Sequence, residues 1–525
     1  MTSGLDSARR MSHGEQLGRV ARRTPQAEAL RFLGTSRTFG ELDERVDRLC
    51  DALQARGIGT GDRVATLMTN RMEVVETYLA ACRLGAICVP VNFRLVADEI
   101  TYILQDSGAT LLVVDEGLAC VAGAVRQRAT GVAHCLVTSG HPSAAGPGSE
   151  AYEDVLVAAS ADFDRPDVPE ELPAFIMYTS GTTGRPKGAV LSHFNLLMNT
   201  FNMIGSMGIA DDDRIWLSGL PLFHIGGLNG ILPYLLLGGT SVILPSGHFD
   251  AEQVVDMFER EGITSCYFVP TQWQAICAVP GLGKRDLSTL RRISWGASVA
   301  PPSVLQAMAD AFPGVPNFNA FGQTEMSSVT CVLRGEDAVR KMGSVGNPIP
   351  GVEVRVVDDD MQDVPQGEVG EIVYRGPTVM QGYWNKPEAT DDAFAGGWFH
   401  SGDLVRQDEE GFYYVVDRKQ DMIVSGGENI YCAEVEAAID AHAGVLEVAV
   451  ISLPDPKWGE VPMAVIVPVD PTCPPTEAEI IDWCRQRMAS YKKPAMVVAV
   501  DQLPRNASGK VLKTRLRTTY VPAAQ

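Results

Sequence analysis

The chain has 525 residues, of which 45% are hydrophobic and 21% are charged, so it has enough apolar material for more than one core. Its formal net charge at pH 7 is −21. Because so acidic a surface repels phosphate backbones, nucleic acid is excluded as a general partner, and an anionic nucleotide would need cations gathered at its own site.

The cysteines and the apolar segments predict a compartment. Eleven cysteines are scattered without a C-x-x-C pair, which is typical of free thiols in a reducing environment. The N-terminus is polar and arginine-rich and does not read as a secretory signal. The longest apolar stretch, Leu228 to Pro245, is interrupted by Asn, Pro and Gly and makes a poor membrane span. We therefore expect a cytoplasmic protein without an integral membrane segment.

Helix and strand patterns alternate up to about Pro350. Residues 72–84 place apolar side chains on one helical face, Gly85 follows as a stop, and Ser192 is placed to cap a later helix. Short apolar strands are predicted at 86–91, 175–178, 241–244, 265–269 and 291–295. Residues 139–150 predict a surface loop. The alternation predicts α/β layers with largely parallel sheets.

The pattern changes after Val352. Alternating segments at 352–357 and 370–374 predict a small antiparallel barrel or sheet. Beyond Asp417, helices are predicted at 433–441 and 477–488, and strands at 446–451, 463–467 and 497–500. We therefore expect an α/β protein with a large N-terminal domain over residues 1–418, which includes a small β-barrel-like subdomain, and a small α+β domain over residues 419–525.

The most distinctive segment is Tyr178-Thr-Ser-Gly-Thr-Thr-Gly-Arg-Pro-Lys-Gly188, which follows a predicted strand. Its glycines let the backbone approach an anion, its hydroxyls can donate to phosphate oxygens, and Lys187 supplies a positive charge. The candidate phosphate-binding residues are Thr179, Ser180, Gly181, Thr182, Thr183, Gly184 and Lys187. A flexible surface turn is the alternative, but the length of the pattern favours a nucleotide-phosphate site.

This segment resembles the signature loop of the adenylate-forming superfamily, which contains acyl-CoA synthetases, peptide-synthetase adenylation domains and beetle luciferases. Further motifs in the family's order extend the resemblance over nearly the whole chain, which looks most like the fatty-acyl-CoA ligases of actinobacteria. The resemblance implies an ATP-dependent enzyme. It would form an acyl adenylate with release of pyrophosphate and then transfer the acyl group to the thiol of CoA.

Three motifs of the larger domain supply implied nucleotide contacts. Asn319-Ala-Phe-Gly-Gln-Thr-Glu325 resembles the family's Tyr-Gly-x-Thr-Glu motif, with Phe in place of the usual Tyr. There Phe321 and Gly322 would bind adenine, Thr324 would contact the α-phosphate, and Glu325 would bind Mg²⁺. The strand-end turn Gly296, Ala297 and Ser298 would line adenine and the acyl pocket. Asp403, in Trp398-Phe-His-Ser-Gly-Asp403, would accept hydrogen bonds from the ribose hydroxyls.

The C-terminal motifs imply a moving domain. Arg418 would contact the nucleotide at the hinge, where Gln420 departs from the usual Lys or Asp. Gly426 and Gly427 belong to a loop that would line the tunnel for the pantetheine arm of CoA. Lys510, in Pro504-Arg-Asn-Ala-Ser-Gly-Lys510, would bridge the substrate carboxylate and the α-phosphate. Rotation of the small domain would exchange Lys510 for that loop between the two half-reactions.

The segment Pro221-Leu-Phe-His-Ile-Gly-Gly227 resembles the entrance of the acyl pocket. Amino-acid-activating relatives have an Asp near the position of His224, so this chain favours an acid without an α-amino group. His224 either gates the pocket or packs as an ordinary residue, and both roles stay open. The same alternative of pocket or core applies to Met203, Trp273, Trp295, Met326 and Val329.

The expected cofactors are ATP, Mg²⁺ and CoA, and the expected substrate is a hydrophobic carboxylic acid: fatty, cyclic or polycyclic. Gln420 and Phe321 prompt one alternative, an enzyme that performs a single half-reaction. A non-catalytic nucleotide-binding relative is the other, and the presence of Lys187, Glu325 and Asp403 together with Lys510 disfavours it. A homodimer is an option that the sequence leaves open.

Overall fold

The computed structural model describes residues 9–179, 185–210, 214–298, 300–426, 428–505 and 511–521. Several of the residues singled out above lie outside these ranges. They are Ser180, Gly181, Thr182, Thr183, Gly184, Gly427 and Lys510. Within the ranges that are described, no helix combines the length and the apolarity that a membrane crossing needs.

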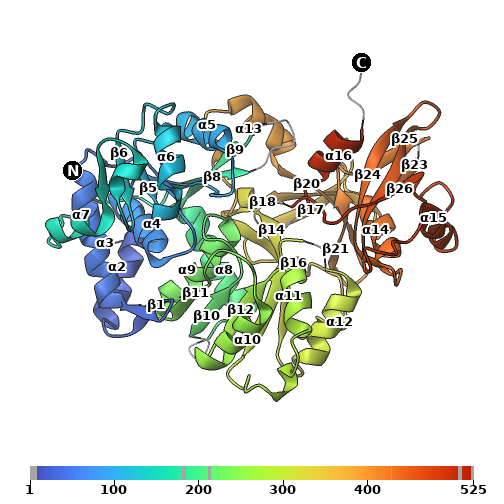
Figure 1. Cartoon of the computed structure of the whole chain (residues 1–525), viewed down its shortest axis with the longest axis horizontal. Helices are drawn as coiled ribbons and strands as arrows, with labels where there is room; N and C mark the ends of the chain where they lie inside the picture. The colour runs from blue at the N-terminus through green and yellow to red at the C-terminus, as the bar shows by residue number, and fades with distance from the viewer. Residues whose placement is uncertain are drawn as a thin grey trace.

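Two large, mainly parallel sheets form the body of the molecule (Figure 1). The first has the order β16 (Asn347–Pro348), β15 (Ser328–Leu333), β14 (Asn317–Gln323), β13 (Arg292–Gly296), β12 (Ser265–Phe268), β10 (Ile215–Ser218), β11 (Thr240–Ile243), β1 (Glu28–Phe32), β2 (Thr35–Thr38). The second has the order β19 (Gly382–Tyr383), β9 (Lys187–Ser192), β8 (Pro173–Thr179), β4 (Ile87–Pro90), β3 (Arg63–Leu67), β5 (Leu111–Val114), β6 (His134–Val137), β7 (Ser149–Ala151). Antiparallel strands occur at their ends, and β19, β9 and β8 are the antiparallel group of the second sheet.

Helices cover these sheets in layers. The central core cluster draws residues from both sheets and from α2 (His13–Arg23), α3 (Phe39–Gln54), α4 (Met72–Leu84), α7 (Tyr152–Ala158), α8 (His193–Met207) and α9 (Ile225–Leu237). A second cluster joins the first sheet to α10 (Ala251–Arg260), α11 (Pro270–Cys277) and α12 (Pro302–Ala311). A third joins the second sheet to α5 (Ala97–Ser107) and α6 (Ala119–Arg126). This is the layered α/β arrangement that the alternating pattern predicts.

Two smaller sheets follow along the chain. The first is a four-stranded antiparallel sheet of β17 (Glu353–Val357), β18 (Val369–Arg375), β20 (Phe399–Gln407) and β21 (Tyr413–Arg418). The second contains β23 (Glu428–Ile430), β22 (Ile423–Ser425), β25 (Gly459–Pro468), β24 (Val445–Asp455) and β26 (Met496–Ala499), with α14 (Cys432–Asp440), α15 (Glu477–Arg485) and α16 (Lys513–Tyr520). In Figure 1 it forms the red and orange end of the molecule, beyond the four-stranded sheet. β21 ends at Arg418 and the next strand belongs to the other sheet, which supports our proposed division at 418/419.

Local signals place most elements within a residue or two of their predicted positions. The helix predicted at 72–84 is α4, and its cap Gly85 has φ +70°. Ser192 caps α8, and its hydroxyl accepts from the backbone N–H of Asn195 at 3.1 Å. Several predicted bounds are wrong, since β24 extends four residues beyond 451 and β25 begins four residues before 463. The predicted loop 139–150 contains the start of edge strand β7, and the helix predicted to reach residue 488 ends at Arg485.

Candidate active site

The distinctive loop joins two antiparallel strands. β8 and β9 pair with Thr179 opposite Lys187 and Tyr178 opposite Gly188, so the loop closes a hairpin. We expected the strand before the loop and a helix capped by Ser192 after it, but strand β9 lies between the loop and that helix. Lys187 is therefore held on a strand end, and its side chain, like that of Thr179, is half-buried.

Glu325 lies beside this hairpin, although it belongs to the turn between β14 and β15 of the first large sheet. It lies in the short 3-10 turn Thr324–Met326 that follows β14, and only 8% of it is exposed. Its Oε1 accepts hydrogen bonds from Thr179 Oγ1 at 3.3 Å and from the Tyr383 hydroxyl at 3.0 Å. Its backbone carbonyl accepts from the N–H of Met380 at 2.7 Å. The carboxylate is thus fixed at the base of the hairpin.

Tyr383 is a site residue that the motifs did not indicate. Strand β19 pairs with β9 so that Tyr383 lies opposite Ala189, and the Lys187 ammonium lies 5.0 Å from the centre of its ring. Burial and the adjacent Glu325 carboxylate raise the pKa of Tyr383 far above its usual value, so the phenol stays a hydrogen-bond donor. The only local signal was an aromatic pair after a glycine, Gly382-Tyr-Trp384, which fits a packing residue equally well.

These residues fit a magnesium ion that is shared with phosphate. Mg²⁺ is usually held by one or two carboxylates together with substrate phosphates and water, not by a cage of protein ligands. Glu325 supplies a hard oxygen ligand, and the Thr179 hydroxyl lies within hydrogen-bond distance of it. The described ranges contain no group of three or more His, Cys, Asp or Glu that could hold a metal without substrate.

The predicted adenine wall forms where β13 and β14 end side by side. Gly296 lies opposite Ala320, and a Cβ on Gly296 would approach the Ala320 carbonyl oxygen to 2.2 Å, so glycine is required there. The next residue, Ala297, turns the chain with φ +66° and is exposed together with Ser298. Phe321 is half-buried on the neighbouring strand. The exposed turn therefore follows directly after Gly296, whose register partner Ala320 precedes Phe321.

Gly322 lies near the end of β14 and Thr324 lies in the turn that follows it. A Cβ on Gly322 would come within 1.8 Å of the Ser328 carbonyl oxygen, because β14 and β15 approach each other closely there. Thr324 begins the turn that carries Glu325 and is half-buried. The hydroxyl of Thr330 donates to the Phe321 carbonyl at 3.2 Å and links this strand to the Tyr374 hydroxyl of β18 at 3.3 Å.

Asp403 and Arg418 pair with each other across β20 and β21. They are register partners, and Arg418 Nε lies 2.7 Å from Asp403 Oδ1. Asp403 is buried with 3% exposure, and its backbone N–H donates to Ser401 Oγ at 2.9 Å. The predicted ribose acceptor and the predicted hinge contact therefore form one ion pair at the end of the four-stranded sheet.

The residues that follow, at the predicted hinge, form ion pairs with both the four-stranded sheet region and the smaller domain. Lys419 Nζ lies 2.7 Å from Asp359 and 3.1 Å from Glu371, both in or next to the four-stranded sheet, whereas Asp421 pairs with Arg517 of α16 at 2.7 Å. Gly426 has φ +60°, and its backbone N–H donates to the Trp458 carbonyl at 2.8 Å. The predicted tunnel glycine therefore lies at a tight turn of the smaller domain.

The residues predicted for the acyl pocket lie in different settings. His224 is the N-cap of α9, where its Nδ1 accepts from the Gly226 N–H at 3.1 Å, so the ring has at least a structural role. Trp273 is fully buried, and its Nε1 donates to the Ser294 carbonyl at 2.9 Å, which makes it a core residue. Trp295 is also buried but lines an apolar groove of about 580 Å³. Met203, Met326 and Val329 are buried in the central core.

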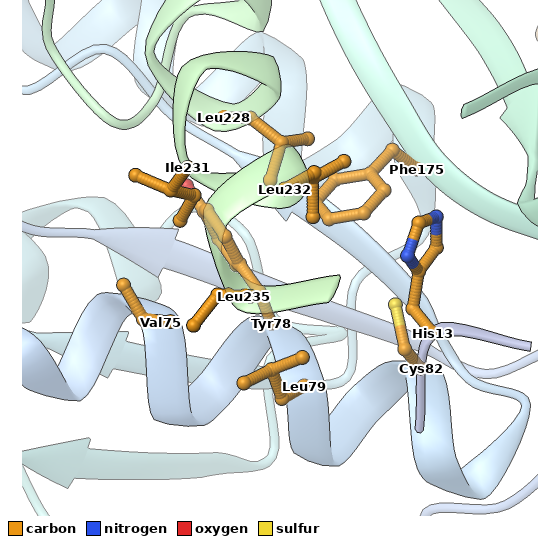
Figure 2. Close-up of a pocket in the computed structure, with 10 residues that line it drawn as sticks. All are labelled: His13, Val75, Tyr78, Leu79, Cys82, Phe175, Leu228, Ile231, Leu232 and Leu235. Carbon is orange, nitrogen blue, oxygen red and sulfur yellow. The ribbon is translucent and has the colours of Figure 1, made fainter. Parts of the chain in front are cut away.

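A second cavity lies between α2, α4 and α9 and is too small for a substrate. Figure 2 shows leucine and isoleucine side chains of α9 facing Val75, Tyr78 and Leu79 of α4, with His13 at one end. Its volume is about 10 Å³, which is roughly the room that one water molecule needs. Its apolar walls identify it as a gap in the packing between helices.

The chain matches two family models. Residues 17–384 match the model described as AMP-binding enzyme, and residues 434–510 match the model of the AMP-binding enzyme C-terminal domain.

Among proteins of similar sequence, a feruloyl-CoA synthase of Amycolatopsis is 42% identical over 96% of this chain and 98% of its own. An indoleacetate–CoA ligase of Aromatoleum aromaticum is 38% identical over 97% and 98%. A long-chain-fatty-acid–CoA ligase of Mycobacterium tuberculosis is 36% identical over 92% and 93%. Among solved structures, an anthranilate CoA ligase in complex with anthranoyl-AMP superposes with a TM-score of 0.89 at 28% identity, covering 97% of each chain.

Proposed function

The chain belongs to the AMP-binding enzyme family, and from that premise we propose that it activates a hydrophobic or aryl-substituted carboxylic acid with ATP and transfers the acyl group to CoA. It is an acid–thiol ligase, and the identity of the acid is the part that we propose. The observation that carries the proposal is the convergence of Thr179, Lys187, Glu325 and Tyr383 from separate elements at one point.

The chemistry explains why these groups are needed together. A carboxylate oxygen is a poor leaving group, and its attack on the α-phosphorus of ATP turns that oxygen into part of AMP, a good leaving group. Two anions must approach each other in that step, so positive charge is needed where they meet. We assign Lys187 and Thr179 to the departing pyrophosphate and Glu325 to Mg²⁺, which would neutralise phosphate charge when bound. Lys510 would offset the charge at the α-phosphate.

The remaining predicted residues complete the proposal. Gly296, Ala297, Phe321 and Gly322 would hold adenine, and Asp403 with Arg418 would hold the ribose. The accessible turn after β13 and the buried carboxylate at 403 support these roles.

The acid is proposed from three observations. Phe223 packs edge-on against Phe93 beside His224, so the predicted pocket entrance is aromatic. The chain has no Asp next to His224 to bind an ammonium group. Two of the relatives are named for the aromatic substrates feruloyl and indoleacetate, and they are more similar to this chain than the fatty-acid ligase is. We therefore place aryl-substituted acids ahead of long-chain fatty acids.

We further propose that residues 419–525 rotate as a unit between the two half-reactions. The support is the arrangement of the hinge, where Lys419 pairs with the four-stranded sheet and Asp421 pairs with the smaller domain. The Lys419–Asp359 pair is exposed, and its exchange with solvent costs little, because exposed ion pairs contribute about 0–1 kcal/mol.

One experiment tests the function. The protein is incubated with ATP, Mg²⁺, CoA and a panel of acids (hydroxycinnamic, indole-acetic, succinylbenzoic and long-chain fatty), and pyrophosphate release and thioester mass are followed. In parallel, synthetic acyl adenylates are supplied with CoA. We expect both products in the first format, with the highest kcat/KM for an aryl-substituted acid.

The control separates the alternatives. Thioester formed only from supplied adenylate would contradict a complete enzyme, and ATP binding without product in either format would indicate a non-catalytic relative. Lys510→Ala should lower adenylation far more than thioester formation from supplied adenylate. An equal loss in both would count against rotation of the smaller domain.

A further inference from the structure

Asp106 is an acidic residue outside the predicted site that contacts two segments of it, the end of β8 and the stretch after β19. Its Oδ2 accepts from the Tyr178 hydroxyl at 2.8 Å, and its Oδ1 lies 3.0 Å from Lys386 Nζ. Its backbone carbonyl accepts from Trp384 Nε1 at 3.1 Å. Figure 1 shows the helix that carries it, α5, beside α13 (Pro387–Ala393) and β9.

We propose that Asp106 is a positioning residue for the first half-reaction, which holds Thr179 and Lys187 on one side and Tyr383 on the other in the geometry that binds the phosphates of ATP. The proposal rests on the function proposed above. It adds a residue that neither the motifs nor the first contacts of the site include.

The position of Asp106 in its helix is unfavourable for a carboxylate, which indicates that its contacts stabilise it. α5 spans Ala97–Ser107, so Asp106 lies in the last turn, where the helix dipole disfavours negative charge. Its side chain is also only 10% exposed, which adds a desolvation cost for a carboxylate. Its partners, the Lys386 ammonium and the Tyr178 hydroxyl, offset both costs.

The first arm of the network reaches the hairpin. Tyr178 directly precedes Thr179, so the bond from its hydroxyl to Asp106 fixes the end of β8 that carries the Thr179 hydroxyl. Tyr102, one turn before Asp106 on α5, donates to the Pro186 carbonyl at 3.2 Å, next to Lys187. The same helix thereby contacts Tyr178 at the end of β8 and Pro186 directly before β9.

The second arm reaches the metal side. Trp384 and Lys386 follow the end of β19, and the backbone N–H of Trp384 also donates to the Gly188 carbonyl at 2.7 Å. The preceding residue is Tyr383, which donates to Glu325. Anchoring this segment to Asp106 therefore sets the position of Tyr383 relative to Glu325 and Lys187.

Both oxygens of the Asp106 carboxylate are needed. An asparagine would keep one acceptor and replace the other with an N–H₂ group, which cannot accept from either Tyr178 or Lys386. Burial and the hydrogen bond to Asp106 raise the pKa of Tyr178 far above its usual value, so this phenol stays a donor.

The test compares the two half-reactions in Asp106→Asn, Asp106→Ala and Tyr178→Phe. Adenylation is followed as acid-dependent exchange between pyrophosphate and ATP, and the second step is followed as thioester formation from supplied acyl adenylate and CoA. We expect kcat/KM for ATP in adenylation to fall about 10- to 100-fold in both Asp106 variants, because small displacements of reacting groups have effects of that size. Tyr178→Phe, which removes one hydroxyl, should show a smaller loss.

The second step should stay within about twofold of the wild-type rate, because the predicted phosphate contacts act in the first step. Asp98→Asn is the matched control, since Asp98 lies on the same helix with its side chain 79% exposed and pairs with Arg128 on the surface. Equal loss of both half-reactions in the Asp106 variants would reduce the residue to a general structural role and overturn the proposal. Adenylation in the Asp106 variants that equals the rate of the Asp98→Asn control would overturn it as well. Lack of adenylation in the wild-type protein would instead contradict the proposed function.

Discussion

At the scale of single residues, the site depends on how one carboxylate oxygen is shared. Glu325 Oε1 accepts from both Thr179 and Tyr383, and with respect to the described residues Oε2 is the oxygen that remains for a metal ion. Two donors on the same oxygen hold the carboxylate in one orientation. Its fixed position fits the magnesium role that we propose for it.

Replacing this carboxylate should separate binding from folding. Glu325→Gln keeps the volume but removes the charge, so we expect adenylation to fall about 100-fold or more and the Mg²⁺ concentration for half-maximal rate to rise. Pyrophosphate exchange measured over a Mg²⁺ titration checks this. Glu336→Gln, in an exposed loop, is the control. An unchanged Mg²⁺ dependence in Glu325→Gln would contradict a metal-binding role.

Tyr383 yields a second prediction at this scale. Tyr383→Phe retains the ring under Lys187 and loses the donor to Glu325, so adenylation should fall roughly tenfold, since a hydrogen bond to a charged group contributes about 1.5–3 kcal/mol. Because the pKa of Tyr383 is raised far above its usual value, the loss should be constant between pH 6 and 9. A loss that varies with pH across this range would point to titration of the phenol instead.

At the scale of elements, the strand pairs determine which residues meet. β20 and β21 place Asp403 opposite Arg418, whereas β19, only two residues long, carries Tyr383 to the start of β9. Gly382 in that strand has φ +135°, and a Cβ there would approach Thr390 Cγ2 to 2.9 Å. Short pieces of strand thus position the site through their register and not through their own stability.

The β20–β21 pair gives a prediction for nucleotide binding. Asp403→Asn preserves volume but removes the charge opposite Arg418, so we expect the KM for ATP to rise about tenfold with a smaller change in kcat. Steady-state adenylation over a range of ATP concentrations measures it. Glu409→Gln, exposed in the loop of the same hairpin, should leave the KM unchanged. If kcat alone falls in Asp403→Asn, the residue does not hold the ribose in the ground state.

At the scale of the whole molecule, an N-terminal helix is joined to the sheet region by two buried histidines. His13 of α2 and His193 of α8 have ring centroids 5.7 Å apart, and the backbone N–H of His13 donates to His193 Nδ1 at 3.4 Å. Burial lowers the pKa of His13 to about 4, and burial with the neighbouring His13 lowers that of His193 to about 3. Both rings are therefore neutral in the folded protein near pH 7.

This pair predicts the acid sensitivity of the fold. The unfolded chain binds these protons at its ordinary pKa of about 6.5, so stability is complete above that pH and is lost as the pH falls toward 4. His13→Leu, next to the apolar cavity of Figure 2, should reduce the loss of unfolding free energy between pH 7 and 4 by about 3 kcal/mol. Urea unfolding at several pH values measures it.

The comparison needs a histidine that is not buried. His248→Gln, at an exposed position, should leave the pH dependence as it is in the wild type. If His13→Leu loses as much stability as the wild type on acidification, other groups cause the acid unfolding.

Much of the architecture follows from local sequence. The helix Met72–Leu84 with its Gly85 cap, and the apolar strands of both large sheets, depend on periodicity and turn residues that act over a few positions. The adenylate-forming resemblance is confirmed by the family models and by relatives that match over nearly the whole chain. The roles of the individual motif residues stay predictions until the variants above are measured.

The sequence by itself determined the family and the α/β class, and it singled out the charged motif residues that we propose for ATP, because a motif keeps its chemistry in consecutive positions. Only the tertiary structure decided that Tyr383 donates to Glu325 and that Arg418 pairs with Asp403. It also decided that Asp106 joins the β8–β9 hairpin to the segment after β19. These contacts connect elements that are distant in the chain. They depend on strand pairing and register, and no local pattern of residues specifies which distant strand a short segment will join.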